Sequence, residues 1–207
     1  TAFTTVLIPS FGLVGPNGEP IVNVDNDNET WENVSGKIGL NYHLSEDIML
    51  YASYSTGYKT GGYSASQSVS YDPETVDAIE GGLKSVWFDQ KIQTNITGFY
   101  YDYTDKQEFF RNPNGGGTAI ENAGAATVWG AELEVSARAT SALMIDFSMS
   151  YLNTEYDKFL TSDPRTLLAA DLSGNKLSRA PEWKTHLGIQ YEWELGGLGT
   201  VIGRVDT

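Results

Sequence analysis

The chain has 207 residues, of which 40% are hydrophobic, 12% are aromatic and 22 are glycine. This length is typical of one domain or of one large piece of a bigger one, and no run approaches the roughly 20 apolar residues of a membrane helix. The net charge of -14 argues against nucleic-acid binding, which needs a footprint of Lys and Arg. Since the chain has no Cys, thiol catalysis, thiolate metal sites and disulfides are excluded.

Alternation of apolar and polar residues predicts β-strands along most of the chain, because successive side chains of a strand point to opposite faces. In chain order we expect a partial strand over residues 1–8, full strands over 31–44, 48–60, 74–87, 91–107, 121–139, 143–156 and 183–193, and a partial strand over 200–205. Short turns at 45–47, 89–90, 140–141 and 196–197 alternate with long loops at 9–29, 61–73, 111–118 and 157–181. The prediction is therefore all-β and antiparallel, with about seven full strands and two partial ones.

Residues 127–139 (TVWGAELEVSARA) are compatible with a strand of a soluble sandwich or of a membrane barrel. One face of this strand is apolar and contains Leu133, whereas the other contains Glu132 and Glu134. In a soluble sandwich the apolar face would pack in a core. In a membrane barrel it would face lipid, and the carboxylates would face a wet lumen.

Three regularities favour the membrane barrel over the sandwich. Short and long connections alternate strictly, and the strands are at least as long as the about 9–11 residues that cross a bilayer at a tilt. Aromatic residues gather near both ends of the strands, as in the two girdles of outer-membrane barrels. The residues near the short turns are Tyr42, Trp87, Phe88, Tyr191 and Trp193, and those near the long loops are Tyr58, Tyr100, Tyr101, Tyr103 and Tyr156. We therefore predict an up-and-down transmembrane β-barrel.

Charged residues on the polar faces of several strands are predicted to form a lumen-facing ion-pair network. They are Lys37, Lys59, Glu80, Lys84, Glu132 and Glu134. An alternative is that Glu132 and Glu134, which share a face, form a carboxylate pair for acid–base catalysis. Lysines at the same face of other strands favour the ion-pair network.

Other candidate sites are weaker. Asp25, Asp27 and Glu29, with Glu32 nearby, resemble part of a Ca²⁺ site but lack the glycine of an EF-hand loop. His43 and His186 are the only histidines and lie on different strands, so a shared metal would require tertiary coincidence. The glycines at 115–117 are followed by no Lys-Ser/Thr pair and do not form a phosphate loop. We predict no catalytic residue, resident metal or cofactor.

Five stretches, taken in order, resemble the barrel domain of TonB-dependent outer-membrane receptors. They are 51–62 (YASYSTGYKTGG), 73–85 (PETVDAIEGGLKS), 95–107 (NITGFYYDYTDKQ), 122–134 (NAGAATVWGAELE) and 179–183 (RAPEW). The resemblance covers residues 31–193 and implies a barrel of about 22 strands filled by an N-terminal plug, with a short segment that engages TonB. The sequence departs from the family in three features, since we find no plug, no TonB-engaging segment and no terminal strand ending in an aromatic residue. We therefore expect an internal fragment of the barrel domain, although closure into a small barrel of about eight strands is conceivable.

The resemblance implies a bacterial outer-membrane receptor that couples energy from TonB to the uptake of an iron–siderophore complex or a similar scarce nutrient. Ligand contacts are expected on the long-loop side, where Arg side chains suit an anionic chelate and aromatic rings stack on it. The candidate ligand-binding residues are Tyr63, Phe109, Arg111 and Arg165. The expected partners are the ligand, TonB and outer-membrane lipids, with no nucleic acid. The alternative function is a passive porin or a structural or adhesive barrel without ligand gating, and an enzyme is a distant third.

Overall fold

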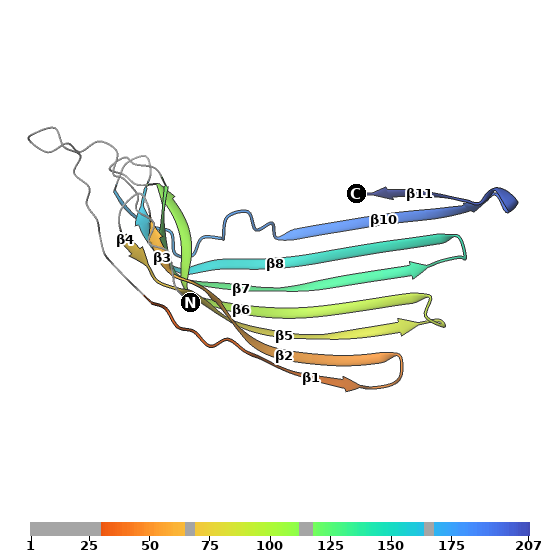
Figure 1. Cartoon of the computed structure of the whole chain (residues 1–207), viewed down its shortest axis with the longest axis horizontal. Helices are drawn as coiled ribbons and strands as arrows, with labels where there is room; N and C mark the ends of the chain where they lie inside the picture. The colour runs from red at the N-terminus through yellow and green to blue at the C-terminus, as the bar shows by residue number, and fades with distance from the viewer. Residues whose placement is uncertain (1–29, 65–68, 112–117, 164–167) are drawn as a thin grey trace, which may run out of the picture.

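The computed structural model describes residues 30–64, 69–111, 118–163 and 168–207. Most of these residues form one curved, open antiparallel sheet, in which strands adjacent in sequence are usually adjacent in space (Figure 1). Within the described ranges no helix reaches the length and apolarity of a bilayer-crossing segment, and the one helix is the short 3₁₀ turn η1 (Gly196–Leu198). The predicted all-β, up-and-down arrangement is confirmed.

The large sheet has the order β1-β2-β5-β6-β7-β8-β10-β11, and a ninth strand, β9, pairs with β8. The strands of the main path are β1 (Lys37–His43), β2 (Ile48–Lys59), β5 (Glu74–Trp87), β6 (Ile92–Arg111), β7 (Thr118–Arg138), β8 (Leu143–Ser162), β10 (Trp183–Glu194) and β11 (Thr200–Asp206). The short strands are β3 (Gly62–Ser64), β4 (Val69–Tyr71) and β9 (Ala169–Asp171). Because β1 and β11 lie at opposite edges of the sheet, the described strands do not close into the small barrel considered from sequence (Figure 1).

Several boundaries differ from the predicted ones. The strand predicted over 31–44 is shorter than expected, because ladder pairing with β2 begins only at Lys37. The partial strand predicted over 1–8 lies outside the described residues. β6, β7 and β8 are longer, because β6 and β7 keep pairing as far as Arg111 and Thr118, and β8 pairs with β9 beyond residue 156. The predicted loop over 61–73 contains the β3–β4 hairpin. Periodicity identified these elements, whereas their lengths depend on the partner strand.

Cross-strand pairing aligns the two faces of β7 with the corresponding faces of the other strands in the sheet. Leu133 lies in one row with Ile96 of β6 and Met149 of β8, and the row continues to Leu83 and Leu50. This outer face exposes many large apolar side chains, and Ile96 is 47% exposed. An apolar face of this extent needs an apolar covering.

Aromatic side chains bound this apolar band. Tyr100 and Trp129 lie in one cross-strand row with Ile79 of β5, and this row marks one aromatic level. Trp87, eight residues along β5 from Ile79, marks the other level. At about 3.4 Å per residue and a strand tilt of about 40°, the two levels are roughly 20 Å apart, close to the about 25 Å band of membrane barrels.

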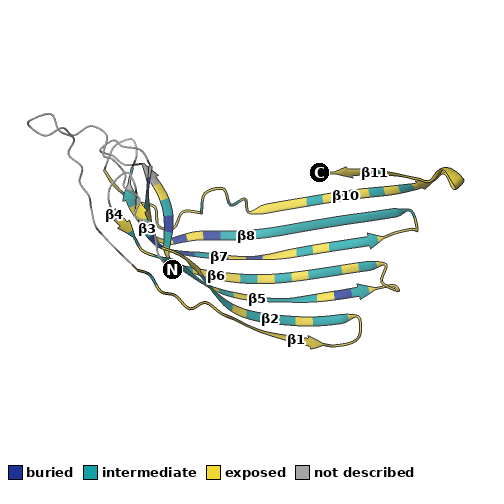
Figure 2. Ribbon diagram, in the orientation of Figure 1, coloured by how far each residue is buried: buried dark blue, intermediate teal, exposed yellow. Residues whose placement is uncertain are grey.

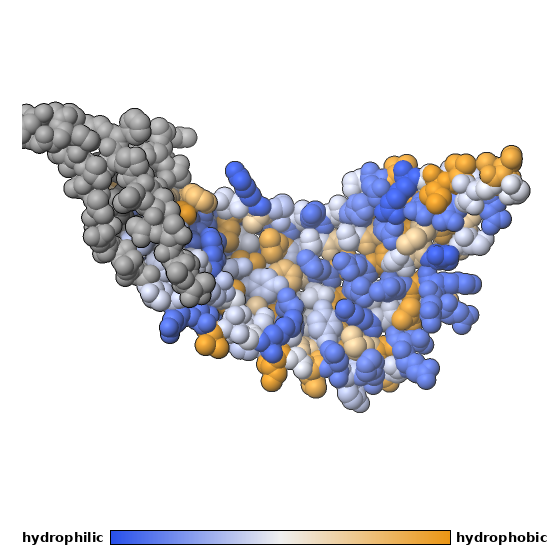
Figure 3. All heavy atoms as spheres, viewed as in Figure 1, coloured by the Kyte–Doolittle hydropathy of each residue, from blue (hydrophilic) through white to orange (hydrophobic). Residues whose placement is uncertain are grey.

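Buried side chains are few, and all of them except Ser85 of β5 lie toward the long-loop ends of β6, β7 and β8 (Figure 2). Among the described residues the buried apolar ones are Ala119, Ala126, Val128 and Tyr156, and the buried polar ones are Ser85, Gln107 and Thr154. In Figure 3, hydrophilic residues gather toward the short-turn ends of the strands, and hydrophobic residues lie at the tip beside η1. The packed part of the fold is therefore at the long-loop end.

Candidate functional site

The inner face of the sheet is mostly polar. One cross-strand row runs from His43 through Met49, Lys84, Asn95, Glu134 and Ser148 to His186. His43 and His186 occupy its two ends, six strand spacings of about 4.8 Å apart, which is roughly 29 Å along the sheet. The two histidines therefore cannot share a metal ion in this sheet.

The six residues predicted to form an ion-pair network lie on this face, but their contacts here are of other kinds. Glu80 accepts a hydrogen bond of 2.7 Å from the Tyr101 hydroxyl, and Glu134 accepts one of 3.2 Å from the Asn95 amide. The Lys84 ammonium lies 5.7 Å from the centre of the Tyr51 ring. In the described part of the chain no salt bridge joins the six to one another. Their pairing with other parts of the receptor stays a prediction.

Glycines let long side chains cross a whole strand on the inner face. Tyr51, Gly82 and Thr97 stand in one row on β2, β5 and β6. The Tyr51 ring lies across Gly82, and its hydroxyl hydrogen bonds with the Thr97 hydroxyl at 2.7 Å. Side chains thus link β2 directly to β6, two strands that the backbone ladders connect only through β5.

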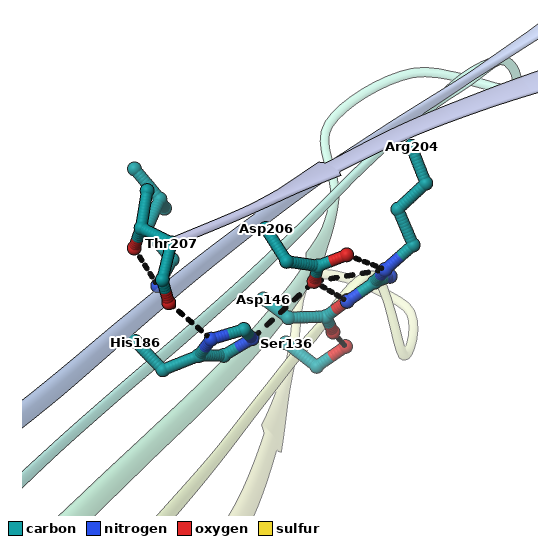
Figure 4. A network of polar contacts seen from close by, with 7 residues as sticks. Ser136, Asp146, His186, Arg204, Asp206 and Thr207 are labelled. Carbon is teal, nitrogen blue, oxygen red and sulfur yellow. Dashed lines mark hydrogen bonds and ion pairs between the residues drawn. The ribbon is translucent and has the colours of Figure 1, made fainter.

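The same arrangement recurs near the short turns, in a charged cluster (Figure 4). Arg204 of β11 reaches over Gly188 of β10 and donates to Asp146 of β8 at 2.9 Å. Its guanidinium also donates to Asp206 at 2.8 Å, and Asp206 lies 3.5 Å from His186. The cluster is not evident from the sequence, because its residues come from three strands whose register is fixed only in the folded sheet.

We expect Arg204→Gln to lower the free energy of unfolding in dilute buffer but to have little effect near 1 M salt. The reason is that the guanidinium and both carboxylates are partly exposed, and the Debye length falls from about 10 Å at 0.1 M to about 3 Å at 1 M. Arg138→Gln is the matched control, since Arg138 lies in the same cross-strand row as Arg204 without a salt bridge among the described residues. Denaturant unfolding of the complete receptor in lipid vesicles at both salt concentrations checks this, and equal losses for the two variants would contradict it.

The long-loop end contains three of the four predicted ligand-binding residues, Tyr63, Phe109 and Arg111. Tyr63 on β3 is 42% exposed, and its ring centre lies 6.3 Å from that of Trp31. Phe109, which pairs with Ile120 in the β6–β7 hairpin, is 74% exposed. Arg111 is the last residue of β6, and Arg165 lies outside the described residues. The structure thus places Tyr63 and Phe109 on two different hairpins at the same end of the sheet.

A hollow of about 440 Å³ lies at this end, between β7, β8 and β9. Its lining residues are Glu121, Leu160, Thr161, Ala169, Ala170 and Asp171. Burial raises the pKa of the Glu121 carboxyl, whereas hydrogen bonds from the Ser173 hydroxyl and amide lower the pKa of Asp171. The hollow therefore combines one carboxyl whose pKa is raised with one whose pKa is lowered. The hollow is not evident from the sequence, because β9 lies within a segment predicted to be a loop.

Comparison with known proteins decides the family. The family model described as TonB dependent receptor-like, beta-barrel matches residues 11–206. This chain belongs to the TonB-dependent receptor barrel family. The family consists of transport receptors of the bacterial outer membrane.

Solved receptors of this family contain a similar sheet. The ferric yersiniabactin uptake receptor FyuA from Yersinia pestis matches with a TM-score of 0.63 and 20% identity over 83% of this chain and 25% of that one. The siderophore receptor PiuA from Acinetobacter baumannii matches with a TM-score of 0.61 and 21% identity over 75% and 23%. The copper transporter OprC matches with a TM-score of 0.57 and 19% identity over 77% and 24%. The chain thus spans about a quarter of these receptors, and at these identities the likeness shows the fold alone.

Two stretches considered as binding sites from the sequence lie outside the described residues. The acidic run Asp25, Asp27 and Glu29 precedes the first described residue, and the glycines at 115–117 lie between β6 and β7. Glu32 is described and is exposed. The Ca²⁺ alternative therefore stays untested.

Proposed function

We propose that this chain is part of the barrel wall of an outer-membrane receptor that imports a scarce nutrient as an iron–siderophore complex or a similar chelate, with energy supplied through TonB. The observation that carries the proposal is the two-faced sheet: an apolar band between aromatic levels outside, and a polar face inside that runs to the long-loop end. The family assignment and the uptake receptors among its structural relatives support it. The plug and the TonB-engaging segment would then lie elsewhere in the receptor.

On this proposal each part of the chain has a separate task. The outer face seals the wall against hydrocarbon, and the inner face provides hydrogen-bonding groups such as Glu80, Asn95 and Glu134 along a wet conduit. The long loops provide the first contact with the ligand. Arg111 and Arg165 would bind anionic carboxylate or catecholate groups through their planar guanidinium forks, and Tyr63 and Phe109 would stack on rings of the ligand.

The passive porin is the competing function, and the complete reading frame separates the two. A plug domain upstream of Thr1 supports active uptake, and a bare signal peptide directly before a strand contradicts it. The functional test measures uptake of radioactive iron chelates by cells that express the complete receptor, with and without TonB. Accumulation that does not depend on TonB would favour the porin.

We expect the double change Arg111→Ala and Arg165→Ala to reduce uptake at low ligand concentration. A charge-assisted hydrogen bond is worth about 1.5–3 kcal/mol, so the loss of even one contact should weaken binding by at least about tenfold. Ligand binding to whole cells checks this. Lys91→Ala is the control, because it removes a positive charge at a short turn of the opposite end. Unchanged uptake in the double variant would remove these two arginines from the proposed site.

A further inference from the structure

The β3–β4 hairpin stands apart from the large sheet. It forms a two-stranded sheet of its own, and among the described strands no backbone ladder joins it to the others. Tyr63, one of the proposed ligand-contact residues, is carried on this hairpin. Whatever holds the base of the hairpin therefore determines where Tyr63 is presented.

Two side-chain amides hold that base. The Gln107 side-chain amide donates to the carbonyl oxygens of Thr60 and Asp72, both at 3.0 Å. Thr60 and Asp72 flank the hairpin on its two sides, so one side chain binds both ends of it. Gln107 is only 6% exposed, and its backbone N–H donates to the Glu74 carboxylate at 2.8 Å.

Asn122 completes the contact from the neighbouring strand. It pairs with Gln107 in the β6–β7 ladder, and its amide donates to the Asp72 carbonyl at 2.9 Å and to the Asp105 carbonyl at 2.7 Å. The Asn122 side-chain oxygen accepts from the Asp72 backbone N–H at 2.7 Å. Asp72 is thus fixed through both its carbonyl and its N–H.

Backbone geometry brings these two amides together. The β6–β7 ladder is irregular on both sides of Lys106, and Asp105 has a φ of 52°. This bulge bends β6 as it leaves the membrane level and presents the Asp105 carbonyl to Asn122. On the hairpin side, a Cβ at buried Gly61 would lie 2.5 Å from the Tyr71 carbonyl oxygen and 2.7 Å from the Trp31 ring, so the chain approaches closely here.

We infer that Gln107 and Asn122 are positioning residues that lock the β3–β4 hairpin onto the β6–β7 hairpin, so that Tyr63 and Phe109 face the ligand from one rigid unit. The ligand in this inference rests on the proposed function, whereas the attachment of one hairpin to the other does not. A receptor in which the two hairpins moved independently would pay an ordering cost each time a ligand bridged them, and the lock removes that cost before binding.

The nearly isosteric changes Gln107→Glu and Asn122→Asp test the inference. At neutral pH each replaces an amide donor with a carboxylate that faces backbone carbonyl oxygens, so the contact becomes repulsive while the shape is kept. The backbone carbonyl groups are then left without their donor, so the unlocked population should rise about fivefold or more. Gln93→Glu is the matched control on the same strand, and Asn41→Asp is the control for Asn122, since both control side chains are exposed.

The readout is the distance distribution between spin labels at Ser70→Cys and Phe109→Cys, measured without ligand in the complete receptor in lipid vesicles. We expect a narrow distribution in the parent protein and in both controls, and a broad one in Gln107→Glu and Asn122→Asp. Acidification should narrow it again for Gln107→Glu, because the protonated carboxyl regains one donor. Retained resistance of the barrel to SDS at room temperature establishes that the variants are folded.

Binding measurements on the same variants without labels complete the test. Weakened binding together with a broadened distribution supports the positioning role. An unchanged distribution in both variants overturns it, even if binding is lost. If the complete receptor transports no chelate, the proposed function fails while the distance measurement still decides whether the lock exists.

Discussion

Replacement of Leu133 by Arg should destabilise the folded receptor by about 2–4 kcal/mol, the cost of placing a guanidinium near the middle of a bilayer. Leu133 lies in the outer row between Ile96 and Met149, midway between the two aromatic levels. The neighbouring change Glu134→Gln should cost about 1 kcal/mol or less, because the side chain stays in the wet lumen and its oxygen still accepts from Asn95. Unfolding by denaturant in lipid vesicles provides both values.

Leu133→Phe separates a lipid-facing position from a packed one. Lipid chains accommodate the added bulk, whereas a close-packed protein core would lose about 1–3 kcal/mol through overpacking. We therefore expect Leu133→Phe to be nearly neutral. If it destabilises the protein as strongly as Leu133→Arg does, Leu133 faces protein and the lipid-facing assignment of the outer surface is wrong.

The faces of the sheet were predictable from sequence because they depend on a local rule. Side chains alternate with a period of two, so the outward position of Leu133 and the inward position of Glu134 follow from their neighbours alone. The same rule placed Lys84 and Glu80 on the inner face, and the register of β5 against β6 agrees. Turn length and strand length then favoured a membrane barrel, and the family match confirms that assignment.

Contacts between strands were not predictable in the same way. Arg204, Asp146 and His186 are separated by up to 58 residues and meet only because the registers of β11, β10 and β8 align them. The lock formed by Gln107 and Asn122 depends on an irregular ladder at Lys106, which no alternation pattern reveals. Glycines such as Gly188 stand where long side chains cross a strand, and nothing in the alternation pattern assigns them this role.

Two adjacent glycines of β5 should therefore respond oppositely to the same substitution. Gly81 lies on the outer face, where an added Cβ would be 3.6 Å from the Tyr51 carbonyl oxygen, an ordinary contact. Gly82 lies on the inner face, where an added Cβ would collide with the Ile96 carbonyl oxygen and approach the Tyr51 ring to 2.7 Å. Gly81→Ala should stabilise the strand by about 0.5–1 kcal/mol through lower chain entropy in the unfolded state.

Gly82→Ala should instead destabilise the receptor by about 1–3 kcal/mol, because a backbone carbonyl cannot move aside as a flexible side chain can. The displaced Tyr51 ring would also lose its 2.7 Å hydrogen bond to Thr97. A double-mutant cycle apportions these two causes: in a Tyr51→Leu background the part of the penalty that comes from the ring and its hydroxyl should disappear, and the part from the Ile96 carbonyl should remain. Denaturant unfolding of the four proteins in the cycle, with Gly81→Ala beside them, measures each part. Equal effects of alanine at positions 81 and 82 would mean that Tyr51 does not cross β5 at Gly82, and that side chains do not join β2 to β6 on the inner wall.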